Sequence, residues 1–370
     1  MPPAGVGSGG AMTMLSPGSL GSPDEARRTD GPVVEVPDHQ EPVLPTPRGP
    51  ITEHLLHHLR LPVHEVPRLP APSDDPIEGE DVPLALHLLY ELHYRGFYDV
   101  DEAWEWEPSL LRERQRLERA FEARLMEEAG AIPIGMSTKA TRAALVDLAA
   151  DTSGADLAER TARVGTLDQV RELLVHRSAH QLRAADPHTW GIPRLRGQAK
   201  VALAAILAEE HGHGAPGEQH ATLFAGAMDE LGVDSRYGAH LDRIPGVTLA
   251  TGNLISLFGL HRRWRAALVG HLALHEMRSV RSMACSLEAL RRLGRGNGSA
   301  ARFVTAHLQT DEEHAVLALD ELVGGLLEEE PILGGEIVFG ARALHAVERR
   351  FAEHVLDRWA AGQSSLRPIA

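Results

Sequence analysis

Apolar residues recur along most of the chain at the three- and four-residue spacing of amphipathic helices. This spacing predicts helices at residues 52–60, 82–95, 107–128, 138–150, 155–163, 167–184, 197–210, 217–232, 236–243, 247–292, 299–325 and 332–361. Within the longest of these segments we expect a break or kink near Gly259 or Gly270. No segment shows the sustained alternation of Val, Ile or Thr that indicates a strand. The pattern therefore predicts an all-α protein.

The same pattern divides the chain into three parts. Residues 1–50 are rich in Gly, Pro and Ser and have too few apolar positions to form a core, so we expect a disordered tail. Residues 51–150 hold the first group of predicted helices, an N-terminal helical section. Residues 151–365 hold the remaining helices and form the larger predicted domain.

Composition excludes several classes of function. The net charge of −15 argues against a nucleic-acid partner, because binding to phosphates needs a basic surface. Cys285 is the only cysteine, which excludes a disulfide framework within the chain and a site built from several thiolates. No long apolar run predicts a membrane span, and the first basic residue, Arg27, comes too late for a typical secretory signal. We expect a cytoplasmic protein that contacts neither nucleic acid nor membrane.

The segment 306–319 carries the clearest chemical signal. His307, Asp311 and His314 stand at positions i, i+4 and i+7, which places all three on one face of a helix. Two imidazoles and a carboxylate are a mixed donor set that iron, manganese and zinc accept. The alternative interpretation is a solvated polar face that happens to contain two histidines.

Two further segments offer carboxylates. Glu210 forms a Glu-x-x-His pair with His213, and His220 lies beyond a Gly/Pro break that would let it converge with Glu210 instead. The alternative for Glu210 is an ordinary surface charge at the end of a helix. Glu276 stands in an otherwise apolar helix, where a carboxylate is costly unless it is paired or bound to a metal. Its neighbour His275 points about 100° away and is interpreted as structural.

Taken in order, Glu210, His220, Glu276 and the triplet at 307, 311 and 314 resemble the haem-oxygenase-like diiron oxidases, also described as iron-containing redox enzymes. Several phrases resemble that family as well, at residues 175–178, 185–190, 192–195 and 290–294. The resemblance covers about residues 80 to 365. It implies a haem-oxygenase-like helical bundle over 151–365, with an N-terminal helical extension.

The resemblance also implies a metal centre with two Fe(II) ions. The ligands that it implies are Glu210, His220, Glu276, His307, Asp311 and His314. One departure concerns the position where the family usually has a further glutamate, which is Ala184 in this chain. Two alternatives therefore stay open. Either the chain binds one iron ion instead of two, or another residue replaces the missing ligand: His180, Asp186, His188 or His213.

The implied function is that of a non-haem diiron enzyme that activates O2. Its expected partners are O2 and a small organic substrate (an amine, an amino acid or a fatty-acid-like molecule), which it would oxidise by N-oxygenation or by C–H or C–C oxidation. Assembly as a homodimer is left open. The alternative function is a degenerate or metal-free member of the same helical scaffold that binds a ligand or pairs with an active homologue.

Overall fold

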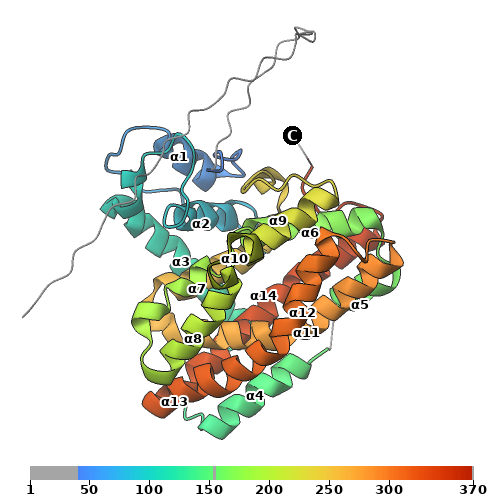
Figure 1. The fold of residues 1–370 in the computed structure, drawn as a ribbon. Coiled ribbons are helices and arrows are strands. Elements are labelled where there is room, and N and C mark those ends of the chain that lie inside the picture. Colours follow the sequence, from blue (N-terminus) through green and yellow to red (C-terminus); the bar gives the residue numbers. More distant parts are fainter. Residues whose placement is uncertain (1–40, 153–155, 369–370) are drawn as a thin grey trace, which may run out of the picture. The chain divides into compact units, whose positions relative to one another are not determined.

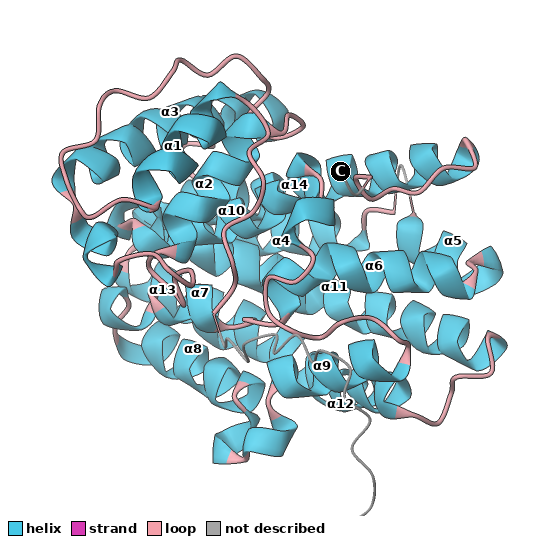
Figure 2. Ribbon diagram, turned by 90° about the horizontal axis from the view of Figure 1, so that it is seen from above, coloured by secondary structure: helices cyan, strands magenta, loops and turns pink. Residues whose placement is uncertain are grey.

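Helices make up the regular structure of the protein in the computed structural model, which describes residues 41–152 and 156–368 (Figure 1). Figure 2 shows these helices joined by loops. None of the residues so described forms a strand, which confirms the predicted all-α fold. Residues 1–40, which make up most of the predicted tail, lie outside the described residues.

The N-terminal section contains four helices, α1 (Pro50–Leu59), α2 (Asp81–Glu91), α3 (Pro108–Ala129) and α4 (Thr138–Ala150). Local sequence signals fix where two of them begin. The Glu107 carboxylate accepts a hydrogen bond from the Ser109 amide at the start of α3, and Ser137 accepts one from the Ala140 amide at the start of α4. Helix α2 is buried on all sides and packs on α10, while α3 and α4 pack on α14. The N-terminal section thus packs directly against the later helices.

The later helices are α5 (Leu157–Val164), α6 (Leu167–Gln181), the short α7 (Asp186–Thr189), α8 (Gly197–Glu210), α9 (His220–Glu230), α10 (Gly246–Leu260), α11 (Arg265–Arg292), α12 (Ser299–Val316), α13 (Gly324–Glu329) and α14 (Gly334–Ala360). A capping box formed by Thr166 and Gln169 starts α6. The long helices α11, α12 and α14 form the centre of the bundle (Figure 1), where α11 packs on both of the others. None of the described helices combines the length and the apolar character needed to cross a membrane.

Glycines let α11 and α14 approach closely. A Cβ atom at Gly270 would lie 1.8 Å from the carbonyl oxygen of Ile337, and one at Gly340 would lie 2.0 Å from that of Ala267. A side chain at either position would overlap the backbone of the facing helix. These two glycines therefore set the distance between the two longest helices.

Several predicted helix bounds were wrong. The predicted helix 236–243 is instead a series of turns ending in a single 3-10 turn, Leu241–Arg243, because Gly238 has a φ of +76°. By contrast, the break expected in segment 247–292 near Gly259 or Gly270 is confirmed close to Gly259: it lies at the 3-10 turn Arg262–Trp264, and Gly270 continues inside α11. The predicted helix 299–325 divides into α12, a π-helical stretch at Leu317–Val323, and α13.

Ordered structure also begins before Pro50, within the predicted tail. The side chain and the amide of Thr46 both donate to Asp242 Oδ1, and Arg48 Nη2 donates to the carbonyl of Leu241 at 2.6 Å. Residues 41–49 are thus held against the loop before α10 by specific hydrogen bonds.

Candidate metal centre

Two of the predicted metal residues flank the turn between α8 and α9. Glu210 is the last residue of α8, and His220 is the first residue of α9. Two 3-10 turns, Gly212–Gly214 and Pro216–Glu218, lead the chain from one helix to the other. Glu210 Oε2 lies 3.0 Å from His220 Nδ1. The break in the sequence therefore brings this carboxylate and this imidazole together, whereas His213 is exposed in the first turn.

A third predicted residue, His307, reaches the same point from α12. Its Nε2 atom lies 2.6 Å from His220 Nδ1. The potential ligand atoms of Glu210, His220 and His307 all lie within 4.8 Å of one another. Both imidazoles are buried. We call these three residues the triad.

Hydrogen bonds on the far side of each ring determine where the imidazole protons lie. His307 Nδ1 lies 2.7 Å from the carbonyl oxygen of Phe303, which can only accept, so Nδ1 carries the hydrogen. His220 Nε2 similarly donates to the side-chain oxygen of Gln181. When both rings are neutral, the remaining nitrogens, His220 Nδ1 and His307 Nε2, direct lone pairs at each other across 2.6 Å. A cation placed between them would relieve this repulsion, and such outer contacts are typical of histidine metal ligands.

The electrostatics of the triad also favour a cation. Burial, reinforced by the neighbouring His220, lowers the pKa of His307 to about 4. Burial by itself raises the pKa of Glu210, but His220 and His307 lower it more, so the net pKa lies well below its usual range. At neutral pH the triad therefore offers a carboxylate and the neutral imidazole of His307. The Nε2 atom of this ring carries no proton that would compete with a metal ion. Two histidines and one carboxylate are the donor set of non-haem Fe(II) sites, so the triad fits an iron ion.

The other predicted residues form a second cluster. His314 Nε2 lies 2.6 Å from Glu209 Oε2, and His314 Nδ1 lies 3.4 Å from Glu276 Oε2. Burial lowers the pKa of His314, but Glu276 and Glu209 outweigh that effect and raise it to about 9. His314 is thus a protonated imidazole between two carboxylates, each of which faces a different ring nitrogen.

The six predicted ligands therefore do not form one equivalent set. The structure brings Glu210, His220 and His307 together, and it pairs Glu276 with His314. Asp311 belongs to α12, but its side chain lies outside the described residues.

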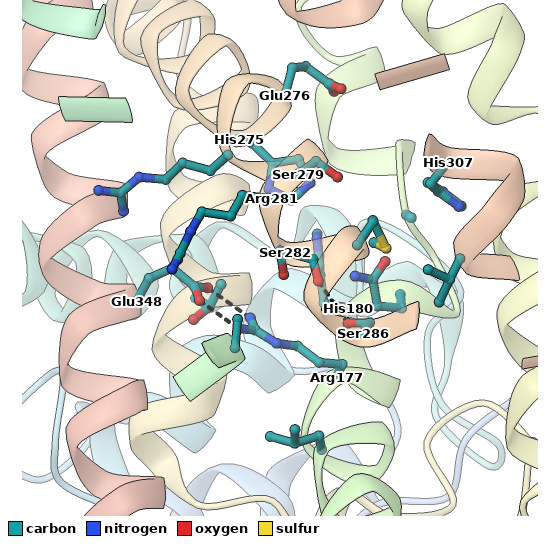
Figure 3. Close-up of a pocket in the computed structure, with 18 of the residues that line it drawn as sticks. Arg177, His180, His275, Glu276, Ser279, Arg281, Ser282, Ser286, His307 and Glu348 are labelled. Carbon is teal, nitrogen blue, oxygen red and sulfur yellow. Dashed lines mark hydrogen bonds and ion pairs between the residues drawn. The ribbon is translucent and has the colours of Figure 1, made fainter. Parts of the chain in front are cut away.

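Both clusters adjoin a cavity of about 470 Å³ inside the bundle. Glu210, His220, Glu276 and His307 line it together with apolar side chains such as Leu272 and Met277. Figure 3 shows Glu276 and His307 in this wall, and it also shows Arg177 joined to Glu348. A buried space next to the triad is what an organic substrate would require.

Ala184 also lines this cavity, and its methyl group offers no donor. Of the four residues considered as replacements, His180 and His188 line the cavity as well. Asp186 does not belong to its lining, and His213 is exposed. His275, interpreted from the sequence as structural, also faces this space (Figure 3).

Sequence reasoning did not identify several residues at the site. Glu209 is one of them, and nothing in its local sequence pattern distinguishes it from an ordinary surface charge at the end of a helix. Gln181 and the Phe303 carbonyl orient the two imidazoles of the triad, yet Gln181 lies far from both in sequence. His271 lies one turn before His275 on α11, and this i, i+4 spacing is the signal that could have found it.

Comparison with known proteins agrees with this geometry. Residues 171–349 match a family described as iron-containing redox enzyme. The matched segment contains every residue of the triad, along with Glu209, Glu276 and His314. No curated protein matches the chain.

Proposed function

Residues 171–349 belong to the iron-containing redox enzyme family, and from this premise we propose that the protein is a non-haem iron oxidoreductase that uses O2 to oxidise a small organic substrate. The triad would hold the first iron ion. A second ion would take its ligands from Glu276 and from His314, which would have to lose a proton to bind it, together with Asp311, the further ligand that the family resemblance implies. The observation that carries the proposal is the convergence of the Glu210 carboxylate with the imidazoles of His220 and His307, whose potential ligand atoms lie within 4.8 Å of one another.

When bound, iron would supply the one-electron steps by which O2 reacts with a closed-shell organic molecule. The substrate classes are those that the family resemblance implies: an amine, an amino acid or a fatty-acid-like molecule. For insertion of one oxygen atom, the second oxygen leaves as water, which consumes two protons and two electrons from an external reductant.

The residues of the chain have three distinct tasks in this proposal. Phe303 and Gln181 hold the imidazoles so that their lone pairs face inward. Glu210 supplies a negative charge that compensates part of the charge of the metal. The cavity holds the substrate beside the triad.

Anaerobic titration of the metal-free protein with Fe(II) tests this function. We expect at least one Fe(II) per chain to bind to the wild type, and His307→Ala to weaken the tightest site about a hundredfold or more, because a ligand is lost. Gln181→Leu keeps every ligand but removes the contact that orients His220, so we expect a loss of about tenfold to a hundredfold. His354→Ala, which changes a histidine on α14 outside the cavity lining, serves as the control and should bind Fe(II) like the wild type.

The same titration decides between this function and the degenerate or metal-free alternative. That alternative is favoured by one observation, the placement of His314 between the carboxylates of Glu209 and Glu276, which occupy both of its ring nitrogens. Two equivalents of Fe(II) would support a diiron centre, and one equivalent lost in His307→Ala would support a single iron at the triad. Absence of Fe(II) binding in the wild type would refute the proposed function.

A further inference from the structure

Three histidines outside the triad line the same cavity, and each has a buried ring nitrogen that forms no hydrogen bond with the described residues. They are His180 on α6, His188 on α7 and His271 on α11. Buried ring nitrogens without a partner are Nδ1 of His180, Nε2 of His188 and both nitrogens of His271. The rings of His188 and His271 lie 5.6 Å apart between centroids. Figure 3 shows His180 in the pocket wall.

His176, a buried histidine one turn before His180, is fully paired by comparison. Both of its ring nitrogens lie 2.9 Å from hydroxyl groups, those of Thr248 and Ser365. A buried polar atom without a hydrogen bond destabilises the folded state, so a cluster of such atoms on one cavity indicates a ligand that completes it.

The chemistry of the cluster indicates which kind of ligand this is. Burial, the largest cause, lowers the pKa of all three histidines well below the usual value, so each ring is neutral at physiological pH. A neutral imidazole has one N–H donor and one acceptor nitrogen. Arg177, one of four arginines in the cavity lining, already forms a two-point ion pair with Glu348, with distances of 2.8 and 2.5 Å.

A metal ion does not fit this cluster as well as it fits the triad. Among the described residues, the atoms that converge closely enough to share one ion are those of Glu210, His220 and His307. His180, His188 and His271 form no such group, and the ring centroids of His188 and His271 lie 5.6 Å apart.

We propose that His180, His188 and His271 bind the uncharged polar part of the substrate, a group such as an amide that both donates and accepts hydrogen bonds. This inference rests on the proposed function only in treating the cavity as the substrate site. It narrows the substrate class, because a plain fatty-acid chain would leave these imidazoles unpaired.

The test compares three small molecules of the same chain length on metal-free protein by NMR titration. Hexanamide donates and accepts hydrogen bonds, 2-heptanone has the same shape but only accepts, and hexanoate carries a charge. We expect hexanamide to bind at least about threefold more tightly than either of the others. The double substitution His188→Leu and His271→Leu should weaken hexanamide binding about tenfold and change 2-heptanone binding by less than about twofold.

His54→Leu is the matched control, because His54 Nε2 is also buried without a partner but does not line the cavity. It should leave the affinities for all three molecules unchanged. If the double variant does not fold, histidine ring ¹⁵N shifts in the wild type replace it, and hexanamide should move the signals of these three rings.

Equal affinity for hexanamide and 2-heptanone, tighter binding of hexanoate, or no binding of any of the three would overturn the inference. The proposed function is tested separately by Fe(II). Loss of hexanamide binding preference with normal Fe(II) uptake contradicts only this inference, whereas absent Fe(II) uptake with the preference intact contradicts only the iron function.

Discussion

Each imidazole of the triad donates its N–H hydrogen to an acceptor on the side of the ring that faces away from the site. The nitrogen that faces the site is therefore the one that can bind a cation. His307 donates to a backbone carbonyl inside its own helix, so its tautomer is fixed by the fold of α12. His220 depends on Gln181, a side chain from α6. One of the two rings is therefore oriented locally and the other by tertiary packing.

Buried histidines should also make the protein sensitive to acid. Burial, with help from Arg183 and Arg48, lowers the pKa of His87 to about 3. Between pH 6.5 and 3 the unfolded chain then binds a proton that the folded protein does not, so stability is lost as the pH falls through this range. We expect the free energy of unfolding of the metal-free protein to fall from pH 6.5 to 5, with His87 contributing up to about 1.4 kcal/mol per pH unit.

Chemical denaturation at a series of pH values, with His87→Leu, measures this contribution. The free energy of unfolding of His87→Leu should depend less steeply on pH than that of the wild type, by the equivalent of about one proton. His57→Leu is the control, because His57 is exposed, and its slope should equal that of the wild type. If the free energies of unfolding of His87→Leu and the wild type changed with pH in parallel, His87 would not have the lowered pKa.

At the level of elements, the closest helix contact is the one between α11 and α14. Because a Cβ at Gly270 would overlap the carbonyl of Ile337, we expect Gly270→Ala to destabilise the fold by about 1–3 kcal/mol or more. Gly226 on α9 is the matched helical control, since a Cβ there would make an ordinary contact at 3.6 Å with Ser299. Gly226→Ala should be neutral or stabilise by about 0.5–1 kcal/mol.

Thermal or chemical unfolding of the two variants measures this difference. Equal stability of Gly270→Ala and Gly226→Ala would mean that α11 and α14 can separate without cost. In that case the shape of the cavity, which α11 and α14 both line, would not depend on this crossing.

The sequence allowed most helices to be predicted, because apolar spacing reports directly on which helix face is buried. It also indicated that Glu210 and His220 could converge, because Gly and Pro must reverse the chain between them. The placement of His314 could not be predicted in this way. Helical spacing puts His307 and His314 on one face, but their partners, Glu209 and Glu276 among them, come from other helices whose packing the spacing does not specify.

Breaks in regular helices were predictable only where the sequence marks them. The break at Arg262–Trp264 lies close to Gly259, where it was expected. The π-helical stretch Leu317–Val323 interrupts the spacing of α12 without any Gly or Pro inside it, so the sequence gives no sign of it.

For the whole molecule, the site exists only when distant segments pack together. Glu210 and His220 come from the turn between α8 and α9, His307 comes from α12, and α6 and α11 complete the cavity wall. Because the unfolded chain has no such site, iron that binds the triad must also stabilise the fold. Metal binding and packing of the bundle are therefore coupled in this account.

The location of bound iron tests the central claim most directly. Crystals grown with Fe(II) under anaerobic conditions can be measured on both sides of the iron absorption edge, which identifies iron by its anomalous scattering. The account predicts an iron peak bonded to Glu210, His220 Nδ1 and His307 Nε2, and no such peak in His307→Ala crystals. Iron bound elsewhere, with these three side chains uncoordinated, would contradict it.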